Sequence, residues 1–226
     1  MPEITVVFLT LKLALVVTAI LLLIATPLAW WLSQSTSVLK PYVSAICTLP
    51  LVLPPTVLGF YLLLILGPNG PLGELANYLG IKSLPFSFSG IVIACVVHTL
   101  PFVVQPIQNA FEAIGRKPLE VASTLRANSV QTFWRVVFPL ARPGFFTAAV
   151  MGFCHTIGEF GVVLMIGGNI AGKTRVMSIE IYNHVEAMEY REAHWLAGCL
   201  VLFSFVSLLL IHAVNERYKG RVLACV

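Results

Sequence analysis

Residues Leu13–Trp31 read LALVVTAILLLIATPLAWW, a run of apolar side chains interrupted only by two threonines and one proline. A helix needs about 20 such residues to cross the hydrocarbon core of a bilayer. The run ends in Trp30 and Trp31, and tryptophan is enriched where a membrane meets water. The stretch therefore predicts a transmembrane helix.

Four further apolar runs follow it: Val43–Leu66, Phe86–Phe111, Gly144–Ile166 and Trp195–Val214. Charged residues make up 11% of the chain, against roughly 25% in soluble domains. No polar stretch is long enough for a soluble domain, so residues 1–226 are expected to form a single transmembrane domain. We predict an all-α membrane protein of five to six transmembrane helices. Residues Ile4–Leu9 either extend the first helix or lie on the membrane surface, and Leu72–Leu79 is expected to form a surface helix.

The distribution of Lys and Arg predicts the orientation, because positive charges concentrate in cytoplasmic segments. If the N-terminus lies outside, the inner segments carry nine of these residues and the outer segments carry five. The nine are Lys40, Arg116, Lys117, Arg126, Arg135, Arg142, Arg217, Lys219 and Arg221, and the five are Lys12, Lys82, Lys173, Arg175 and Arg191. We therefore expect the C-terminus and residues 112–142 to lie in the cytoplasm.

Composition excludes several kinds of chemistry. All ten acidic residues are Glu, so a Walker B aspartate and an aspartyl phosphate are both excluded. The cysteines lack the spacing of a metal site and are expected to be small buried side chains. They are Cys47, Cys95, Cys154, Cys199 and Cys225. The net charge of +4 is small, and its Lys and Arg residues are interpreted as signals for orientation in the membrane. Nucleic acid is therefore not an expected partner. We predict no catalytic residue, cofactor or metal.

The segment 112–142 is the most charged part of the predicted inner side. Long loops in compact proteins are usually functional. Pro118 suits the start of a helix. The apolar residues that recur on one face of this first helix are Leu119, Ala122 and Leu125.

A second short helix is expected directly after the first. Either Asn128 or Ser129 caps it, and Gln131 forms a capping-box pattern with Asn128. Pro139 and Pro143 are expected to precede re-entry into the bilayer. The apolar stripe of the second helix consists of Val130, Phe133, Trp134 and Val137. The two helices either lie on the lipid surface, with this tryptophan as an anchor, or dock into a groove on a soluble partner.

The same segment reads Glu120-Val121-Ala122, then Arg126, then Val136-Val137-Phe138-Pro139. It resembles the EAA motif of ABC importer permeases, which is Glu-Ala-Ala, three residues, Gly, nine residues and Ile-x-Leu-Pro. The spacing matches throughout, but Arg126 replaces a glycine that permits positive φ. We expect there either a turn that avoids this conformation or strain. The resemblance implies that a coupling loop contacts an ATPase through Glu120, Ala122, Leu125, Arg126, Ala127 and Pro139.

Residues 167–174 read GGNIAGKT and satisfy the Walker A pattern. That pattern binds phosphates when a strand leads into the loop and a helix leaves it. Here the pattern follows a predicted membrane helix on the predicted outer side, and the chain has no Asp for a Walker B partner. We interpret it as a glycine-rich exit turn.

A second resemblance rests on the runs Gly158-Glu159-Phe160-Gly161, Gly168-Asn169-Ile170, Gly172–Arg175, Ile181–Ala187 and Leu49–Thr56. Together they look like the molybdate permease subunit of ABC importers. Sulfate permeases share the first two elements, and tungstate permeases are similar. The resemblance spans nearly the whole chain and implies a type I importer permease.

The resemblance also implies partners and a location. The chain would be a multi-pass protein of a prokaryotic plasma membrane, working as a homodimer. Two copies of an ATP-binding cassette ATPase would bind the 112–142 loops, and an extracytoplasmic molybdate-binding protein would deliver the anion. Such a subunit catalyses nothing itself. The alternatives are a sulfate or thiosulfate ABC permease and an ATP-independent secondary transporter, although the sequence lacks the internal repeats typical of the latter.

Helix breakers and polar residues lie inside the predicted spans. Pro54 and Pro55 break the second helix and free backbone groups that must be satisfied by protein or water. Thr56 follows them as a possible lining residue. A charge at Glu159 is costly in a bilayer, so this side chain is expected to be protonated, or paired with Lys173 or Arg175.

Glycines and histidines complete this set. Gly158 and Gly161 permit close helix approach around Glu159, which either gates the path or serves only helix packing. His98 and His155 are expected to be packed and hydrogen-bonded, although a dihistidine metal site between their helices stays open. The residues assigned to a translocation path or gate are Pro54, Pro55, Thr56, Gly158, Glu159 and Gly161.

Overall fold

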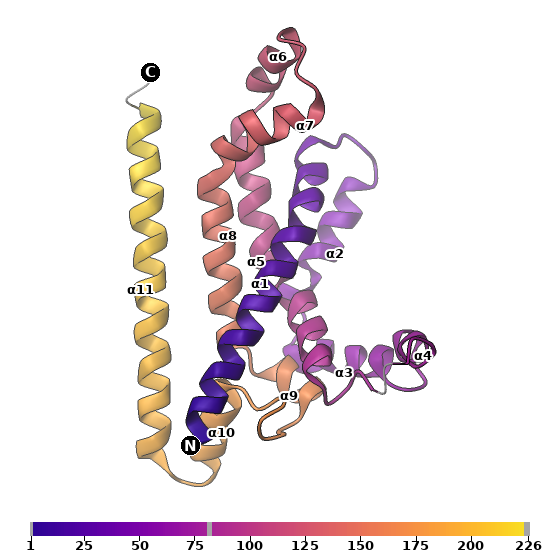
Figure 1. Cartoon of the computed structure of the whole chain (residues 1–226), viewed down its shortest axis with the longest axis vertical. Coiled ribbons are helices and arrows are strands. Elements are labelled where there is room, and N and C mark those ends of the chain that lie inside the picture. Colours follow the sequence, from indigo (N-terminus) through magenta and orange to yellow (C-terminus); the bar gives the residue numbers. More distant parts are fainter. Residues whose placement is uncertain (1, 81–82, 224–226) are drawn as a thin grey trace.

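The computed structural model describes residues 2–80 and 83–223, which form an elongated helical bundle (Figure 1). Lys82 and Cys225, which the predictions above include, lie outside the described residues. The helices are α1 (Pro2–Gln34), α2 (Lys40–Val52), α3 (Pro55–Leu66), α4 (Pro71–Tyr78), α5 (Phe88–Ile114), α6 (Lys117–Thr124), α7 (Ser129–Thr132), the π-helix η1 (Phe133–Val137), α8 (Phe138–Gly158), α9 (Gly161–Gly167), α10 (Met177–Glu186) and α11 (Tyr190–Leu223).

Four described helices are long and apolar enough to cross a membrane, and a bent pair raises the number to as many as five. The four are Ile4–Gln34, Phe88–Ile114, Ser129–Gly158 and Tyr190–Glu216, and the bent pair is α2 with α3. The predicted all-α membrane fold is thus confirmed. Residues Ile4–Leu9 extend α1, and the predicted surface helix is found as α4.

The centre of the bundle consists of α1, α5 and α8, which pack against one another. Their facing sides carry fully buried apolar residues such as Leu21 of α1, Ile107 of α5 and Ala148 of α8. Helix α5 begins where the Ser87 hydroxyl accepts a hydrogen bond from the Gly90 N–H, at 3.1 Å. This three-helix core supports the two broken spans and the loop described below.

The second predicted span is bent far more sharply than a kinked helix. The pair formed by α2 and α3 is bent by 114° at the break between them. Pro54 and Pro55 cannot donate backbone hydrogen bonds, which accounts for the predicted break. Figure 1 shows α3 and α4 extending sideways from the bundle.

The fourth predicted span differs from the sequence-based expectation at both ends. Its helix ends at Gly158 and resumes only at Gly161, so Glu159 and Phe160 form a break that we did not predict. At the other end, Ser129–Gly158 is one continuous helical segment. Pro139 and Pro143 lie within this segment, near the start of α8, and do not interrupt the helix. The π-helical turn η1 accommodates this region, because such turns change the hydrogen-bond register within a helix.

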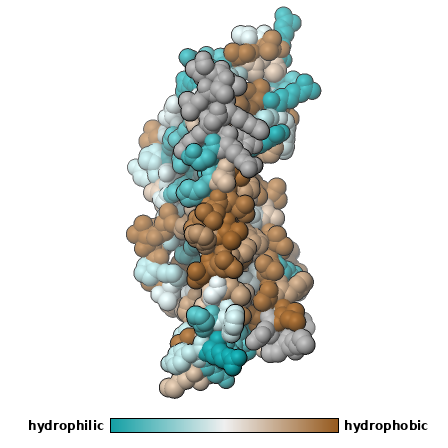
Figure 2. Space-filling model, turned by 90° about the vertical axis from the view of Figure 1, so that its left-hand side faces the viewer, coloured by the Kyte–Doolittle hydropathy of each residue, from teal (hydrophilic) through white to brown (hydrophobic). Residues whose placement is uncertain are grey.

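The last helix, α11, lies beside α8 and α10 at the edge of the bundle. Only 11% of its most apolar window is buried inside the chain. Figure 2, which faces this side, shows a hydrophobic band across the middle of the molecule with hydrophilic surface toward both ends. A band of this kind suits lipid or another apolar surface. Cys199 is exposed on this helix, so its predicted burial was wrong within the single chain.

Candidate functional site

The breaks in the two interrupted spans lie next to each other. Helix α3 packs on α9, and each begins directly after a break. A Cβ atom added at Gly161 would lie 2.8 Å from the Cβ of Pro55, so only glycine fits at this contact. Broken helices that meet inside a bundle are a recurrent feature of transporter binding sites.

The six predicted path residues therefore gather around these breaks, but with different surroundings. Pro54, Pro55 and Thr56 are exposed at the bend between α2 and α3. The close approach predicted for Gly161 is confirmed. The close approach predicted for Gly158 is wrong within this chain, because a Cβ there would meet no atom within 4 Å.

Glu159 is the buried member of the group, with 6% of its surface exposed. Its Oε1 accepts a hydrogen bond from the Val162 N–H of α9, at 3.1 Å. Its Oε2 lies 3.2 Å from His98 Nε2 on α5 and 3.8 Å from His155 Nε2 on α8. We call His98, His155 and Glu159 the Glu159 cluster.

The pairing of Glu159 with Lys173 or Arg175 is a prediction that the structure contradicts. Arg175 instead lies 3.5 Å from Glu180 and donates a hydrogen bond to Asn169 at 2.6 Å. Lys173 is exposed. The physical reason is the unpredicted break after α8, which turns the carboxylate inward toward α5 and away from the turn at residues 167–174.

That His98 and His155 would lie against Glu159 was not predicted from the sequence. His155 precedes Glu159 by four residues in sequence, and this i,i+4 spacing was an available signal for contact on a helix. His98 lies far upstream on α5, and no local pattern connects it to Glu159. Only the packing of α5 on α8 brings these two side chains together.

The turn around residues 167–174 closes on itself. The Thr174 hydroxyl is fully buried, donates a hydrogen bond to the Gly167 carbonyl at 2.7 Å and accepts one from the Ile170 N–H at 3.2 Å. The helix before it is the short α9, and the described residues contain no strand to feed a phosphate loop. The geometry therefore supports the glycine-rich turn over a nucleotide site.

Beyond this turn, polar side chains tie the end of the bundle together. The Asn169 amide group donates to the Asn183 side chain at 2.6 Å, and Asn183 donates to Glu180 at 2.9 Å. The Tyr182 hydroxyl donates to Glu186, and this hydrogen bond raises the pKa of Tyr182. The network holds α10 against the residues that follow α9.

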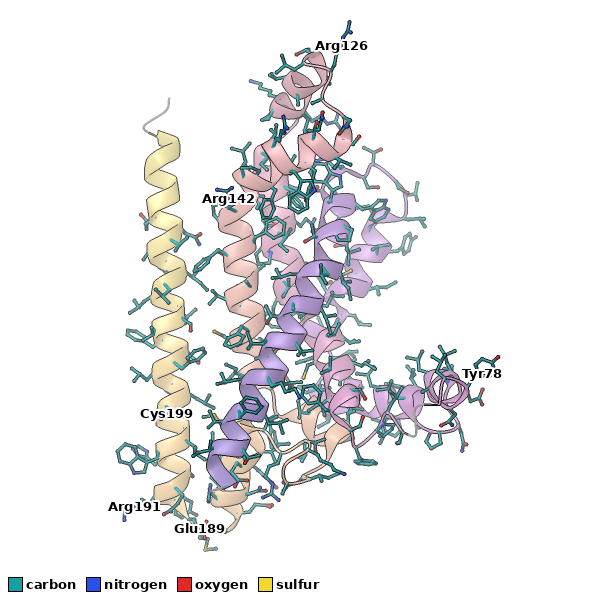
Figure 3. The ribbon with its side chains drawn as sticks, in the orientation of Figure 1. Tyr78, Arg126, Arg142, Glu189, Arg191 and Cys199 are labelled. Atoms are coloured by element: carbon teal, nitrogen blue, oxygen red, sulfur yellow. The ribbon has the colours of Figure 1, made fainter. Side chains whose placement is uncertain are left out.

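At the opposite end of the molecule, α6, α7 and η1 form a segment that we call the loop end, residues 116–137 (Figure 1). The predicted capping box is present, since the Asn128 side chain accepts from the Gln131 N–H at 2.8 Å and the Gln131 side chain accepts from the Asn128 N–H at 3.2 Å. Arg126, labelled in Figure 3, lies at the tip. The loop is therefore ordered by its own sequence.

Arg126 adopts the left-handed conformation that the replaced glycine would favour, with φ of 57°. The Ala127 N–H bonds to the Ala122 carbonyl and the Arg126 N–H to the Ser123 carbonyl. These two bonds are those of a Schellman motif, which usually has glycine at this place. Of the two alternatives for this position, the strained one is found.

The apolar residues of the loop end divide into an inward and an outward set. Ala122 and Val137 are buried, and Leu119 and Phe133 are half-buried against the bundle. Only part of each predicted apolar stripe is therefore exposed and able to contact another protein or lipid. The outward set is highly exposed and consists of Val121, Leu125, Val130 and Trp134. Among the other predicted coupling residues, Glu120 and Arg126 are exposed, and Ala127 and Pro139 are half-buried.

The membrane-spanning bundle, the adjacent broken helices and the helical loop define the chain as a membrane permease. Comparison with known proteins gives the family. The family model of the binding-protein-dependent transport system inner membrane component matches residues 25–221. The chain belongs to this family, whose members are transport subunits of the inner membrane and not enzymes.

Individual relatives agree with this assignment. The chain is 61% identical to the molybdenum transport system permease protein ModB of Azotobacter vinelandii, over 94% of this chain and 93% of that protein. It is 35% identical to a probable sulfate transport system permease protein, cysT, of Zygnema circumcarinatum, over 94% of this chain and 73% of that protein. A crystal structure of a bacterial alginate ABC transporter superposes with a TM-score of 0.70, at 17% identity and over 94% of this chain and 77% of that one, which shows the same fold.

Proposed function

We propose that the chain is the permease subunit of a molybdate importer. The observation that carries this proposal is the 61% identity to a molybdenum transport permease over nearly the full length of both chains. The sulfate permease relative is only 35% identical, and the alignment covers 73% of its length. Tungstate resembles molybdate in size and charge and is the nearest competing anion.

The permease works as a homodimer with two ATPase subunits and an extracytoplasmic binding protein. The apolar surface left open on α2 and α3 supports this assembly, because residues such as Ile46, Leu49 and Phe60 are exposed beside the bend in the span. A large exposed apolar surface next to a broken helix suits a path shared between two copies. Neither copy then needs to enclose the anion alone.

In this proposal the loop end transmits the conformational change of the ATPase to the membrane-spanning helices. Residues Ser129–Gly158 are continuous from the capping box to the break at Glu159, so a displacement of α7 moves the end of α8. The residues that contact the ATPase are Glu120, Arg126 and the outward apolar set, which includes Leu125. Ala122, Ala127 and Pro139 contribute by holding the shape of the loop.

The loop end lies in the cytoplasm in this proposal, with the C-terminus on the same side and the N-terminus outside. The relative placement is supported by Figure 1, in which the end of α11 and α6 lie at one end of the bundle and the start of α1 at the other. Labelling of Arg126→Cys by a membrane-impermeant maleimide added outside intact cells would contradict the proposed orientation.

Substrate transport is tested by reconstitution with the cognate ATPase and binding protein in proteoliposomes. ATP-dependent uptake of radiolabelled molybdate is expected, with strong competition by unlabelled tungstate and weak competition by sulfate. Uptake of sulfate in preference to molybdate would assign the alternative substrate. Uptake that persists without the ATPase would indicate a secondary transporter and overturn the proposal.

A further inference from the structure

The Glu159 cluster has the composition of a metal site. His98 comes from α5, His155 from α8, and Glu159 from the break between α8 and α9. One potential ligand atom from each of the three lies within 4.8 Å of the others. Two imidazoles and one carboxylate are a common set of protein ligands for Zn²⁺.

The spacing of the three side chains is compatible with a shared ion, although the shorter of the two distances also suits a direct hydrogen bond from His98 to Glu159. Zn²⁺ binds nitrogen and oxygen at about 2.0–2.1 Å in tetrahedral geometry, which places neighbouring ligand atoms roughly 3.3 Å apart. Glu159 Oε2 lies 3.2 Å from His98 Nε2 and 3.8 Å from His155 Nε2. The second distance is too long for a hydrogen bond. A small inward shift of the His155 ring would give the geometry of a bound ion.

Unsatisfied polar atoms give independent support for a ligand. Within the described residues, His155 Nε2 and His98 Nδ1 are buried without a hydrogen-bond partner. Buried polar atoms nearly always have a partner, and each exception needs an explanation. His155 Nε2 faces the carboxylate of Glu159, where a bound cation would satisfy both groups.

The surrounding residues hold the three ligands in place. The Val162 N–H occupies Glu159 Oε1, which leaves Oε2 free for an ion. The Ser178 hydroxyl donates to the main-chain carbonyl of Glu159 at 2.6 Å and fixes the break. The ring of His155 stacks on Phe102 with centroids 3.9 Å apart. Supporting contacts of this kind orient the ligands of metal sites.

Charge and access also favour an ion at this place. With both imidazoles neutral, Glu159 leaves an uncompensated negative charge in the bundle, which is costly to bury. A divalent ion would change the charge of the cluster from −1 to +1. About a quarter of the His155 side chain is exposed, whereas His98 and Glu159 are nearly fully buried. The exposed part of His155 is the side from which an ion and a fourth ligand would approach.

We propose that His98, His155 and Glu159 bind one divalent transition-metal ion, with Zn²⁺ the best match to the ligand set. The ion ties α5 to the broken α8–α9 span beside the contact between Pro55 and Gly161. It also removes the negative charge at the break. For an anion permease the site would therefore both fix the broken span and abolish repulsion of the anion; this last consequence rests on the proposed function, whereas binding of the ion does not.

The direct test uses the full chain, purified in detergent with a tag that contains no histidine and stripped with a chelator. Titration with Zn²⁺, followed by calorimetry and metal analysis after gel filtration, is expected to give one bound ion per chain. His98→Gln, His155→Gln and Glu159→Gln should each weaken binding by at least the roughly 10–100-fold that loss of a supporting contact costs. Substoichiometric binding by the unaltered chain would overturn the proposal.

His184→Gln is the matched control. His184 lies 2.8 Å from Glu189 in another His–Glu pair, which has no second histidine and in which the carboxylate is 56% exposed. Like His155 Nε2, His184 Nε2 is buried without a hydrogen-bond partner, so this variant also tests whether an unpaired imidazole nitrogen alone is enough for binding. This variant should bind Zn²⁺ as the unaltered chain does. Equal weakening by His184→Gln and His155→Gln would place binding at scattered surface histidines and refute the cluster as the site.

A second measurement needs no variant and so does not depend on variant folding. Co²⁺ added to the stripped chain should give the intense visible absorption of a tetrahedral site, and an equivalent of Zn²⁺ should abolish it. A weak six-coordinate spectrum, or absorption that Zn²⁺ leaves unchanged, would overturn the proposal. Neither experiment involves the ATPase, the binding protein or the anion, so the metal site and the proposed function fail or succeed separately.

Discussion

The regions at the two ends of the continuous helical segment Ser129–Gly158, namely the loop end and the break at Glu159, present opposite kinds of side chain. At the loop end, apolar residues face outward: Leu125 is 78% and Trp134 59% exposed. At the other end, the carboxylate of Glu159 faces inward and is 6% exposed. A cluster of exposed apolar side chains at a polar end of the molecule and a buried charge both call for a partner. At the loop end, Trp134 contacts Phe133 and Phe138 of its own segment but stays more than half exposed, whereas Glu159 is enclosed by two histidines and a backbone N–H.

This difference separates two origins of stability. The Glu159 cluster should contribute to the folding of the chain itself, because its contacts are internal. The outward set of the loop end should contribute to assembly and little to folding. The predictions below test this separation, beginning with the largest expected effect.

Glu159→Ala is expected to destabilise the folded chain the most. The change removes the acceptor of the Val162 N–H and the partner of the His98 ring. A buried donor left without an acceptor costs about 1–3 kcal/mol, and two are left here. The free energy of unfolding, measured by denaturant titration in mixed micelles, should fall accordingly.

Glu189→Ala is the control for this change, since it also removes a Glu–His pair but at a site where the carboxylate is more than half exposed. Exposed pairs contribute about 0–1 kcal/mol. Equal effects of the two variants would mean that the burial of Glu159 has no energetic consequence, and the comparison between the two ends would lose its basis.

Leu125→Glu should act on assembly and not on folding. Burial of a leucine in an interface contributes about 1.5–3 kcal/mol, so its loss should weaken ATPase binding by about 10–100-fold. Pull-down of the ATPase across a range of concentrations measures this change. The unfolding midpoint of the isolated chain should stay the same, because Leu125 contacts little within it.

Leu79→Glu provides the matched control, because Leu79 is similarly exposed but lies after α4, away from the loop end. ATPase binding should be unaffected by this change. Ala122, in contrast, is a poor choice for testing docking, since it is buried within its own chain. Unchanged ATPase recovery with Leu125→Glu would argue that the outward set lies on lipid.

Arg126→Gly is expected to have a small stabilising effect. A non-glycine residue in the left-handed region costs about 1–2 kcal/mol, while glycine costs about 0.5–1 kcal/mol in unfolded-chain entropy. The balance is a gain of roughly 0–1.5 kcal/mol in the free energy of unfolding. Arg135→Gly, within the π-helical turn η1, should instead cost about 1 kcal/mol. A loss of stability with Arg126→Gly would show that its side chain, and not its backbone, stabilises the turn.

These outcomes also separate what local sequence predicts from what it does not. The spans, the break at Pro54-Pro55 and the capping box of Asn128 and Gln131 followed from hydropathy, missing donors and residue spacing. Each is determined by residues a few positions apart. The continuous helix from the loop into α8 was not predicted, because Pro139 and Pro143 were considered only as residues that precede re-entry into the bilayer, although proline is tolerated near the start of a helix.

The Glu159 cluster was missed for a different reason. The break after Gly158 contains no proline, and Gly158 and Gly161 were the only local signals for it. The partner on α5 is set by the packing of two helices that are distant in sequence. Local patterns carry no information on that packing, so Glu159 was expected to be protonated or to pair with Lys173 or Arg175, and its contact with His98 was not predicted.

Lys173→Ala is the change for which we expect no effect, although it alters the most conspicuous motif in the sequence. In a phosphate loop, the lysine at this place contacts phosphates and the following Thr ligates magnesium. Here Lys173 is exposed, and Thr174 is fully buried with its hydroxyl bonded to Gly167 and Ile170. Lys173→Ala should therefore leave both ATP binding and the unfolding midpoint unchanged.

Thr174→Val is its paired variant and should lower the free energy of unfolding by about 1 kcal/mol, because it removes the buried hydrogen bond to the Gly167 carbonyl and the part-buried one from the Ile170 N–H. Binding of a fluorescent ATP analogue to the isolated chain measures the first property, and thermal unfolding the second. ATP binding that is lost in Lys173→Ala would require a phosphate site that this turn does not form. The effects of Lys173→Ala and Thr174→Val therefore distinguish two roles for the glycine-rich residues 167–174. These residues either bind a nucleotide, or they form a turn that closes on itself.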